Sequence, residues 1–317
     1  MKRLILLAMA LCFAHPAAAQ ERRVAVTFDD LPFQTTPEAL CDPVQAMAMT
    51  DAFVGMLAPL DTHATAFVNE GKVCDELRET LLPPILTAWL DAGIGLGNHT
   101  FSHINIHRST PEAYLADLDR GEAITRPLLE ARGLDLVWFR HPYLFTGETP
   151  EKRAALDAGI AARGYRLAPV TIDNEDWRFG QAYRQAEAAG DRALMERIGE
   201  AYVAHMAAVL DAMEPYSADL ADGTEPPQIL LLHANSLNQT WYPAIHALYL
   251  ERGYRFVTLD EAVSHPLYAH EDRWVRANGV SWLHRWAFTE GRRITPEPDT
   301  PQWVVDVAEG RPSTTAP

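Results

Sequence analysis

The sequence predicts an α/β fold, a barrel or near-barrel of about seven parallel strands with helices around it. Seven short apolar runs alternate with segments of helical pattern. Strands separated by helices form parallel βαβ units, and this many of them in one stretch are typical of a barrel rather than a sandwich. Polar residues directly follow several of these runs, as expected for a barrel with a functional site at the carboxyl ends of its strands.

The expected elements follow from the hydrophobic periodicity. Strands are predicted at 23–28, 64–68, 93–97, 136–139, 165–172, 228–232 and 255–259. Helices are predicted at 43–58, 75–91, 111–131, 151–163 and 241–252. The segment 180–215 breaks the alternation with a long helical pattern rich in Ala, Arg and Glu. We interpret it as an insertion that packs outside the barrel or forms one wall of the cleft.

The 317 residues favour one large domain with short additions. We expect a signal peptide at 1–19, a barrel domain at 20–265 that includes the insertion 180–215, and a C-terminal extension at 266–317 that packs on the barrel. The extension contains four tryptophans, Trp274, Trp282, Trp286 and Trp303. Two interpretations of them stay open, namely a tail packed onto the barrel and a platform on which sugars stack.

The first 19 residues have the pattern of a bacterial signal peptide. Lys2 and Arg3 precede an apolar stretch at 4–13, and the small residues 17–19 fit a cleavage site before Gln20. The apolar stretch is too short to span a bilayer, although an uncleaved anchor is the alternative. No later run is long and apolar enough for a membrane helix. The mature protein is therefore expected to be soluble and periplasmic or secreted, with no integral membrane segment.

Charge and cysteine content narrow the class of partner. Against 27 Lys and Arg stand 43 Asp and Glu, a formal net charge of −16. Nucleic acids and anionic lipids bind clustered positive charge, so neither is an expected partner. Cys41 and Cys74 remain after signal cleavage, and an oxidising compartment permits either a disulfide or two separate thiols. The absence of a CxxC motif argues against a zinc site built from cysteines.

Two polar groups suggest a metal site. Asp29 and Asp30 follow the first predicted strand, so that one carboxylate could bind a metal while the other acts as a base. His99 and His103 are four positions apart in the sequence and would face the same way on a helical turn. Together with Asp30 they would form a His2Asp site with open coordination positions, as catalytic metals require. His107 continues the spacing and is expected at the surface.

Three further groups follow later strands. Arg140 could hold a carboxylate in a bidentate grip, and the backbone N–H of Tyr143 could stabilise an oxyanion. An acidic run at 173–176 ends in Trp177, which could wall an apolar pocket, and His233 is a candidate general acid. Taken singly, each group also fits a purely structural role. The functional interpretation rests on the fact that all of these polar groups directly follow predicted strands and would therefore meet at one end of the barrel.

The complete set resembles the polysaccharide deacetylases, also called the NodB homology domain or carbohydrate esterase family 4. The five motifs of that family occur here in the family's order, at 27–30, 99–103, 140–143, 173–177 and 231–233. The resemblance extends over residues 23–263 and implies a distorted (β/α) barrel. It does not extend to the tryptophan-rich tail, and the 180–215 segment is longer than a minimal member needs.

The resemblance implies a role for each matching residue. Asp30, His99 and His103 resemble the metal ligands. The resemblance gives the other matching residues the roles of catalytic base (Asp29), residue that orients the base (Arg140), oxyanion donor through its backbone N–H (Tyr143), general acid (His233), partner that tunes the general acid (Asp176) and lining of the acetyl-methyl pocket (Trp177 and Leu231).

Two positions depart from the family pattern. Leu31 and Leu144 stand where the family usually has glycine after the first and third motifs. The added bulk beside the cleft argues against a long, open polysaccharide groove.

These observations and the resemblance imply a metal-dependent hydrolase that removes N-acetyl groups from an amino sugar or from an amino-sugar polymer, such as a cell-wall or extracellular polysaccharide. Zinc is the expected divalent ion, and cobalt or nickel would also suit a His2Asp site. One alternative is a hydrolase of another C–N bond or of sugar O-acetyl esters on the same scaffold. Another is a non-catalytic carbohydrate-binding barrel. Loss of Asp29 or His233 would favour the non-catalytic alternative, and both are present.

Overall fold

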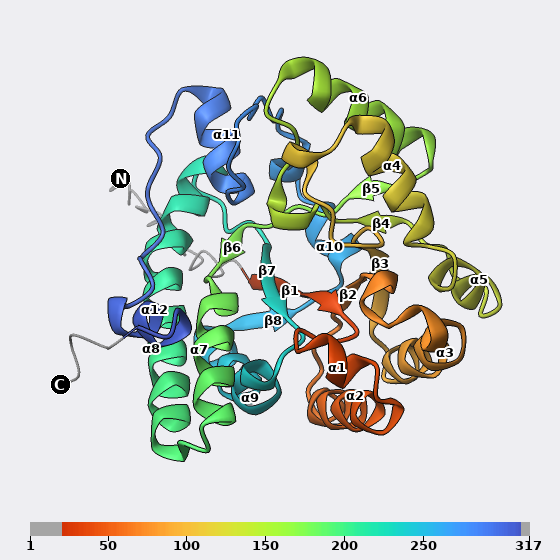
Figure 1. The fold of residues 1–317 in the computed structure, drawn as a ribbon. Helices are drawn as coiled ribbons and strands as arrows, with labels where there is room; N and C mark the ends of the chain where they lie inside the picture. Colours follow the sequence, from red (N-terminus) through yellow and green to blue (C-terminus); the bar gives the residue numbers. More distant parts are fainter. Residues whose placement is uncertain (1–20, 312–317) are drawn as a thin grey trace, which may run out of the picture.

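The computed structural model describes residues 21–311, so the signal peptide predicted at 1–19 lies outside the described residues. A single curled parallel sheet forms the centre of the molecule, with helices outside it (Figure 1). Its strands are β1 (Arg22–Leu31), β2 (Thr65–Val68), β3 (Gly95–Asn98), β4 (Trp138–Phe139), β5 (Arg166–Leu167), β6 (Ile172–Asp173), β7 (Gln228–His233) and β8 (Tyr254–Phe256). Their order is β5-β4-β3-β2-β1-β7-β6, and β8 pairs with β1. The predicted distorted barrel is confirmed.

The barrel is incomplete where one predicted strand is divided. The stretch expected as a single strand at 165–172 forms β5 and β6, which are the two edges of the sheet. The Ala168 N–H still bonds to the Phe139 carbonyl on the β4 side, whereas the Thr171 N–H bonds to the Ile229 carbonyl on the β7 side. Pro169 between them has no N–H to donate to a ladder. The chain therefore changes partners here and bridges the open side of the barrel.

The interior of the barrel changes from apolar to polar along its strands. In β1, Val24 and Val26 belong to the large core between the sheet and the helices, whereas Ala25 belongs to a smaller apolar cluster that also contains Ile229 of β7. Side chains alternate between faces along a strand. Asp29 lies on the same face of β1 as Ala25, four residues further on. Apolar residues therefore fill one end of the barrel, and the acidic residues lie at the carboxyl end.

Helices cover the outside of the sheet. They are α1 (Pro37–Leu40), α2 (Pro43–Leu57), α3 (Asp75–Asp91), α4 (Pro111–Arg120), α5 (Thr125–Glu130), α6 (Pro150–Ala162), α7 (Asp176–Ala188), α8 (Arg192–Leu220), α9 (Ser236–Glu251), α10 (Leu259–Val263), α11 (Trp282–Glu290) and α12 (Gln302–Ala308). Short 3₁₀ turns are η1 (Glu70–Lys72), η2 (Ile106–Arg108), η3 (Pro142–Leu144) and η4 (Pro266–Ala269). Four helices begin with a side-chain cap followed by proline, a combination that favours helix initiation, at Thr36, Asp42, Thr110 and Thr149.

Two helical predictions differ from the structure in continuity. The helix expected at 111–131 is divided into α4 and α5, because α4 ends at Gly121, whose Cα lies against the backbone of Thr100 and Phe101. The 180–215 segment is not one helix but part of the pair α7 and α8. Gly190, at φ 68°, and the Asp191 cap separate the two, which pack side by side (Figure 1). A left-handed glycine followed by a new helix cap ends one helix and starts the next.

The C-terminal segment packs against this helical pair. α11 contacts α8, and α12 contacts α7. Trp274, Trp282 and Trp286 are buried, so these three rings belong to the packed interior and do not offer a surface for stacking sugars. Trp303 is partly buried beneath the Arg197 guanidinium. Within residues 21–311, no helix is both long and apolar enough to cross a membrane.

Candidate active site

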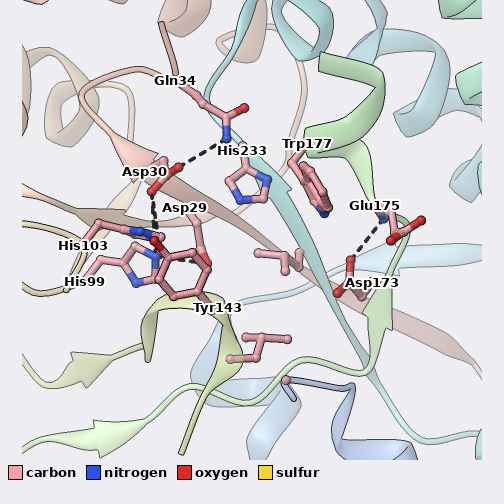
Figure 2. A pocket seen from close by; sticks show the side chains of 13 residues that line it. Asp29, Asp30, Gln34, His99, His103, Tyr143, Asp173, Glu175, Trp177 and His233 are labelled. Atoms are coloured by element: carbon pink, nitrogen blue, oxygen red, sulfur yellow. Dashed lines mark hydrogen bonds and ion pairs between the residues drawn. The ribbon is translucent and has the colours of Figure 1, made fainter. Parts of the chain in front are cut away.

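A cavity of about 410 Å³ lies at the carboxyl end of the strands. Its lining residues are Asp29, Asp30, Gln34, His99, His103, Tyr143, Leu144, Asp173, Glu175, Trp177, Leu231, His233 and Gly279. Figure 2 shows Asp30, His99 and His103 on one side, Trp177 with Asp173 and Glu175 on the other, and His233 between them. Eight of the ten predicted site residues line this cavity. The other two, Arg140 and Asp176, each bond to a lining residue from behind.

The pairing of β1 with β7 places two of these residues side by side. Asp29 is the register partner of His233, and Thr27 is the partner of Leu231. Paired residues of adjacent parallel strands point to the same face of the sheet. The two candidate proton-transfer groups therefore enter the same cavity from neighbouring strands.

Asp29 is buried and paired with a buried arginine. Arg140 Nη1 lies 3.0 Å from Asp29 Oδ1 and 2.6 Å from the Thr27 hydroxyl oxygen. The same guanidinium donates to the carbonyl of Pro169 at 3.1 Å and stacks on the Phe67 ring. Burial raises the pKa of Asp29 above its usual value, although the Arg140 charge opposes that rise. Arg140 thus holds Asp29 in one orientation while burial keeps the carboxylate basic.

His99 is oriented by a backbone carbonyl. Its Nδ1 lies 2.8 Å from the carbonyl oxygen of Arg140. A carbonyl only accepts hydrogen bonds, so Nδ1 must carry the proton, which leaves the lone pair on Nε2. This nitrogen lies 3.7 Å from Asp29 Oδ2 and 3.9 Å from Asp30 Oδ1. Burial lowers the pKa of His99 to about 3 and that of His103 to about 4, so both rings are neutral at pH 7. Neutral imidazole with a fixed tautomer is the form that binds metals.

The segment between the two histidines is not the helical turn that their spacing predicted. Thr100 and His103 have φ values of 64° and 54°, in the left-handed region, and the chain follows an irregular loop. Asp117 of α4 accepts hydrogen bonds from the N–H and the hydroxyl of Ser102, while Asn69 donates to the carbonyls of His99 and Thr100. The histidines converge because tertiary contacts shape this loop, not because of helical periodicity.

Asp30, His99 and His103 form a set that fits a metal ion. One ligand atom from each lies within 4.8 Å of the others, and Asp30 Oδ1 is 3.5 Å from His103 Nε2 and 3.9 Å from His99 Nε2. This buried oxygen has no aligned hydrogen-bond donor among residues 21–311, although Lys72 Nζ lies 3.1 Å away as an ion pair. Two neutral nitrogens and one carboxylate oxygen are donors that zinc accepts.

Lys72 and Gln34 complete the surroundings of Asp30. Lys72 Nζ also donates to the Asp30 carbonyl at 3.1 Å, and Gln34 Nε2 donates to Asp30 Oδ2 at 3.3 Å. Burial would raise the pKa of Asp30, but the Lys72 charge and the nearby histidines hold it well below the usual range. Sequence reasoning missed both residues. Lys72 follows the carboxyl end of β2, and that position was the available signal.

His233 is bonded to a buried carboxylate. Its Nδ1 lies 2.7 Å from Asp176 Oδ1, and Asp176 Oδ2 accepts the His233 N–H and the Asn238 amide. Burial alone would lower the pKa of His233, but Asp176 outweighs burial and raises it to about 9. His233 is therefore protonated at neutral pH, with Nδ1 bonded to Asp176 and the proton on Nε2 free to be donated.

The third motif forms a tight turn at η3. Tyr143 has φ 59° and Leu144 has φ 55°, both in the left-handed region. The Tyr143 ring packs edge-on against His103, at 4.5 Å between ring centroids, and is 49% exposed. His107 does not line the cavity. It stacks on Phe145 and is partly buried, rather than lying at the surface as its spacing suggested.

The side of the cavity opposite the histidines is partly apolar. Trp177, the first-turn neighbour of Asp176 in α7, is 38% exposed, and Leu231 lies two residues before His233 in β7. Asp173 and Glu175 lie beside them, and burial raises the pKa of Asp173 to about 6. Gly279, from the C-terminal segment, also lines the cavity, and nothing local in the sequence indicated its presence here.

The comparisons with known proteins agree with the first three motifs. Residues 17–162, which contain the first three, match the family model "Polysaccharide deacetylase". None of the curated protein sequences matches this chain.

Solved structures that resemble the chain include peptidoglycan deacetylase PdaC from Bacillus subtilis, which is 20% identical with a TM-score of 0.48 over 77% of this chain and 92% of that chain. The family 4 carbohydrate esterase from Streptomyces lividans is 19% identical, with a TM-score of 0.46 over 77% of this chain and 97% of that chain. The CE4 family pseudoenzyme BA3943 from Bacillus anthracis is 16% identical, with a TM-score of 0.49 over 78% of this chain and 66% of that chain. At these identities the likeness assigns no activity. Residues 17–162 of this chain therefore match the polysaccharide deacetylase family, and the curled parallel sheet agrees with the barrel that the resemblance implied.

Proposed function

We propose that this protein is a metal-dependent hydrolase that removes N-acetyl groups from an amino sugar or its polymer. The observation that carries the proposal is the presence of two proton-transfer groups side by side in one cavity. Burial raises the pKa of Asp29 while the Arg140 cation beside it favours the carboxylate, and Asp176 keeps His233 protonated at neutral pH. Opposite protonation states in one cavity are what general acid–base hydrolysis requires.

Asp30, His99 and His103 are the residues that would hold the metal. Their donor atoms and their neutral rings fit a divalent ion, with zinc expected and cobalt or nickel as alternatives. When bound, such an ion supplies Lewis acidity, polarising a carbonyl and lowering the pKa of water.

The remaining residues have separable tasks. Asp29 would accept the proton of the attacking water, held in place by Arg140. His233 would donate its Nε2 proton to the leaving amine, with Asp176 holding the ring by Nδ1. The backbone N–H of Tyr143 would donate to the developing oxyanion, an interaction that speeds the reaction because it is stronger in the transition state than in the ground state. Trp177 and Leu231 would enclose the acetyl methyl group.

Acetate release tests the proposal directly. The substrate panel is peptidoglycan, poly-N-acetylglucosamine, chitin oligomers and acetylated xylan, each incubated with zinc-loaded enzyme and with Asp29→Asn. Release of acetate from an N-acetylated substrate, lost in the variant, supports N-deacetylation. Release from acetylated xylan alone favours the O-acetyl esterase. Sugar binding without acetate release from any substrate favours the non-catalytic alternative; the Bacillus anthracis neighbour is itself described as a pseudoenzyme.

We also propose that the protein is exported and acts on cell-wall or extracellular polysaccharide. The signal pattern at residues 1–19 supports this location. N-terminal sequencing of the mature chain should begin at Gln20, and retention of Met1 in an envelope-free cytosolic fraction would contradict export.

A further inference from the structure

The turn at η3 contains two consecutive non-glycine residues in the left-handed region. Tyr143 has φ 59° and Leu144 has φ 55°. A side chain costs free energy in this conformation, and such residues persist only where the surroundings determine the backbone. The bulky Leu144 is particularly unfavourable there. Something outside the turn must therefore hold it.

The C-terminal segment contacts the carbonyl groups of these same two residues. Gly279 lies against Tyr143 so closely that a Cβ at 279 would be 1.9 Å from the Tyr143 carbonyl oxygen. Arg285 of α11 donates from Nη2 to the Leu144 carbonyl at 2.5 Å and from Nη1 to the Thr146 hydroxyl at 3.0 Å. The Arg285 side chain is fully buried.

A buried network fixes Arg285 in this position. Asp272 Oδ2 lies 3.4 Å from Arg285 Nη1 and 3.2 Å from Arg153 Nη2, and Arg153 also donates to the Thr146 hydroxyl. The guanidinium of Arg285 lies over the Trp282 ring at 4.0 Å. Burial lowers the pKa of Arg285 to about 10, which leaves it charged at neutral pH. A charged, desolvated and multiply bonded arginine has little freedom to move.

The start of α11 is also hydrogen-bonded to the segment between β5 and β6, which bridges the open side of the barrel. The Trp282 N–H donates to the Val170 carbonyl at 2.7 Å. The neighbouring carbonyls of Ala168 and Pro169 accept from Arg140, the partner of Asp29. The tail therefore reaches both the turn and the segment behind the candidate base.

We propose that Arg285 and Gly279 are positioning residues, which hold the η3 turn so that the Tyr143 backbone N–H faces the reacting carbonyl. The proposal rests on the proposed function for its catalytic consequence, while its structural part stands on the contacts alone. The C-terminal segment, which lies outside the residues matched by the family model, would thus help to shape the active site. Neither residue touches the substrate's reacting atoms.

The experiment compares Arg285→Met with Arg292→Met in the metal-loaded enzyme. Arg292 belongs to the same segment but donates to Asp219 on α8, away from the turn. We expect faster amide hydrogen exchange at 143–146 in Arg285→Met only. We also expect kcat to fall about 10–100-fold, in line with the cost of a displacement of about 1 Å, with KM changed less than about threefold. Arg285→Lys should restore part of kcat, because its ammonium group can still donate to the turn.

A second variant shows whether the effects of Arg285→Met arise from the turn or from general misfolding. Gly279→Ala removes no hydrogen bond but forces the Tyr143 carbonyl to move, and it should change exchange and kcat in the same direction. If Arg285→Met fails to fold, Gly279→Ala and Arg285→Lys are subjected to the same two measurements. Unchanged exchange at 143–146 overturns the proposal, as does altered exchange with kcat equal to that of Arg292→Met. A wild-type enzyme without deacetylase activity contradicts the proposed function instead, and the exchange measurement then still decides the structural part.

Discussion

At the scale of single residues, the two adjacent acids of the first motif have different surroundings. Asp29 bonds to Arg140, and Asp30 faces two neutral imidazoles. Asp30 also has φ 72°, which turns its side chain away from the direction that a continuing strand would give it. Position therefore distinguishes two chemically identical carboxyl groups, one suited to accept a proton and the other to bind a cation.

This difference predicts opposite responses to metal. Asp29→Asn should keep metal affinity and lose at least the ~10²–10⁴-fold in rate that a general base contributes, without rescue by excess metal. Asp30→Asn should bind metal more weakly, and high metal concentration should restore part of its activity. Metal titrations of activity for both variants make the comparison. Rescue of Asp29→Asn but not Asp30→Asn would reverse the assignment.

The His233–Asp176 pair predicts a pH dependence. The raised pKa of His233, about 9, means that its proton is present at neutral pH and is lost as pH rises through that value. Activity should therefore decline on the basic side. Asp176→Asn removes the charge that raises this pKa, so the basic limb of kcat/KM should shift to lower pH. The pH profiles of wild type and variant check this, and a basic limb at the same pH in both would exclude His233 as the titrating acid.

At the scale of elements, loops after the strands bring distant residues together. Cys41 ends α1 and Cys74 caps α3, and both are free and partly buried. The neighbouring Cys41 thiol raises the pKa of Cys74. The sequence left open whether these cysteines pair, and the fold brings the two thiols near each other.

We therefore predict that Cys41 and Cys74 form a disulfide when a thiol oxidase or a disulfide donor removes their two electrons and two protons. The bond should stabilise the native state by about 3–4 kcal/mol, by the loop-closure argument for a loop of this length. Intact-mass analysis with alkylation before and after reduction, combined with thermal unfolding under both conditions, measures this. Two alkylatable thiols in protein isolated from an oxidising compartment would contradict it, and Cys41→Ser serves as the control that cannot form the bond.

At the scale of the whole molecule, the candidate metal ligands come from different parts of the sheet. Asp30 belongs to β1, whereas His99 and His103 follow β3, which is two strands away in the sheet order. A site of this kind exists only when the barrel is folded. Metal binding is therefore linked to the unfolding equilibrium of the domain.

Added metal should raise the unfolding temperature. A ligand that binds only the native state contributes about 2.7 kcal/mol at one hundred times its Kd, which corresponds to a shift of about 5 °C or more. Thermal unfolding with and without zinc, cobalt or nickel measures the shift. Asp30→Asn should lose most of it, and Asp29→Asn should keep it. The absence of a shift with all three ions would argue against a metal site.

The barrel and the edge that carries its candidate site were predictable from the amino-acid sequence. The strands were visible as short apolar runs, and the polar residues after them had to gather, because parallel strands end at the same edge. The register pairing of Asp29 with His233 was not predictable, because it depends on the packing of β7 beside β1.

Only the tertiary structure decided how these residues are held. The left-handed loop from His99 to His103, bonded to Asn69 and Asp117, has no local signature in the sequence. The same is true of Lys72 beside Asp30 and of Arg285 behind the η3 turn. Hydrophobic periodicity records which side of an element is buried, whereas these contacts join residues far apart in the chain and depend on the packing of the complete barrel.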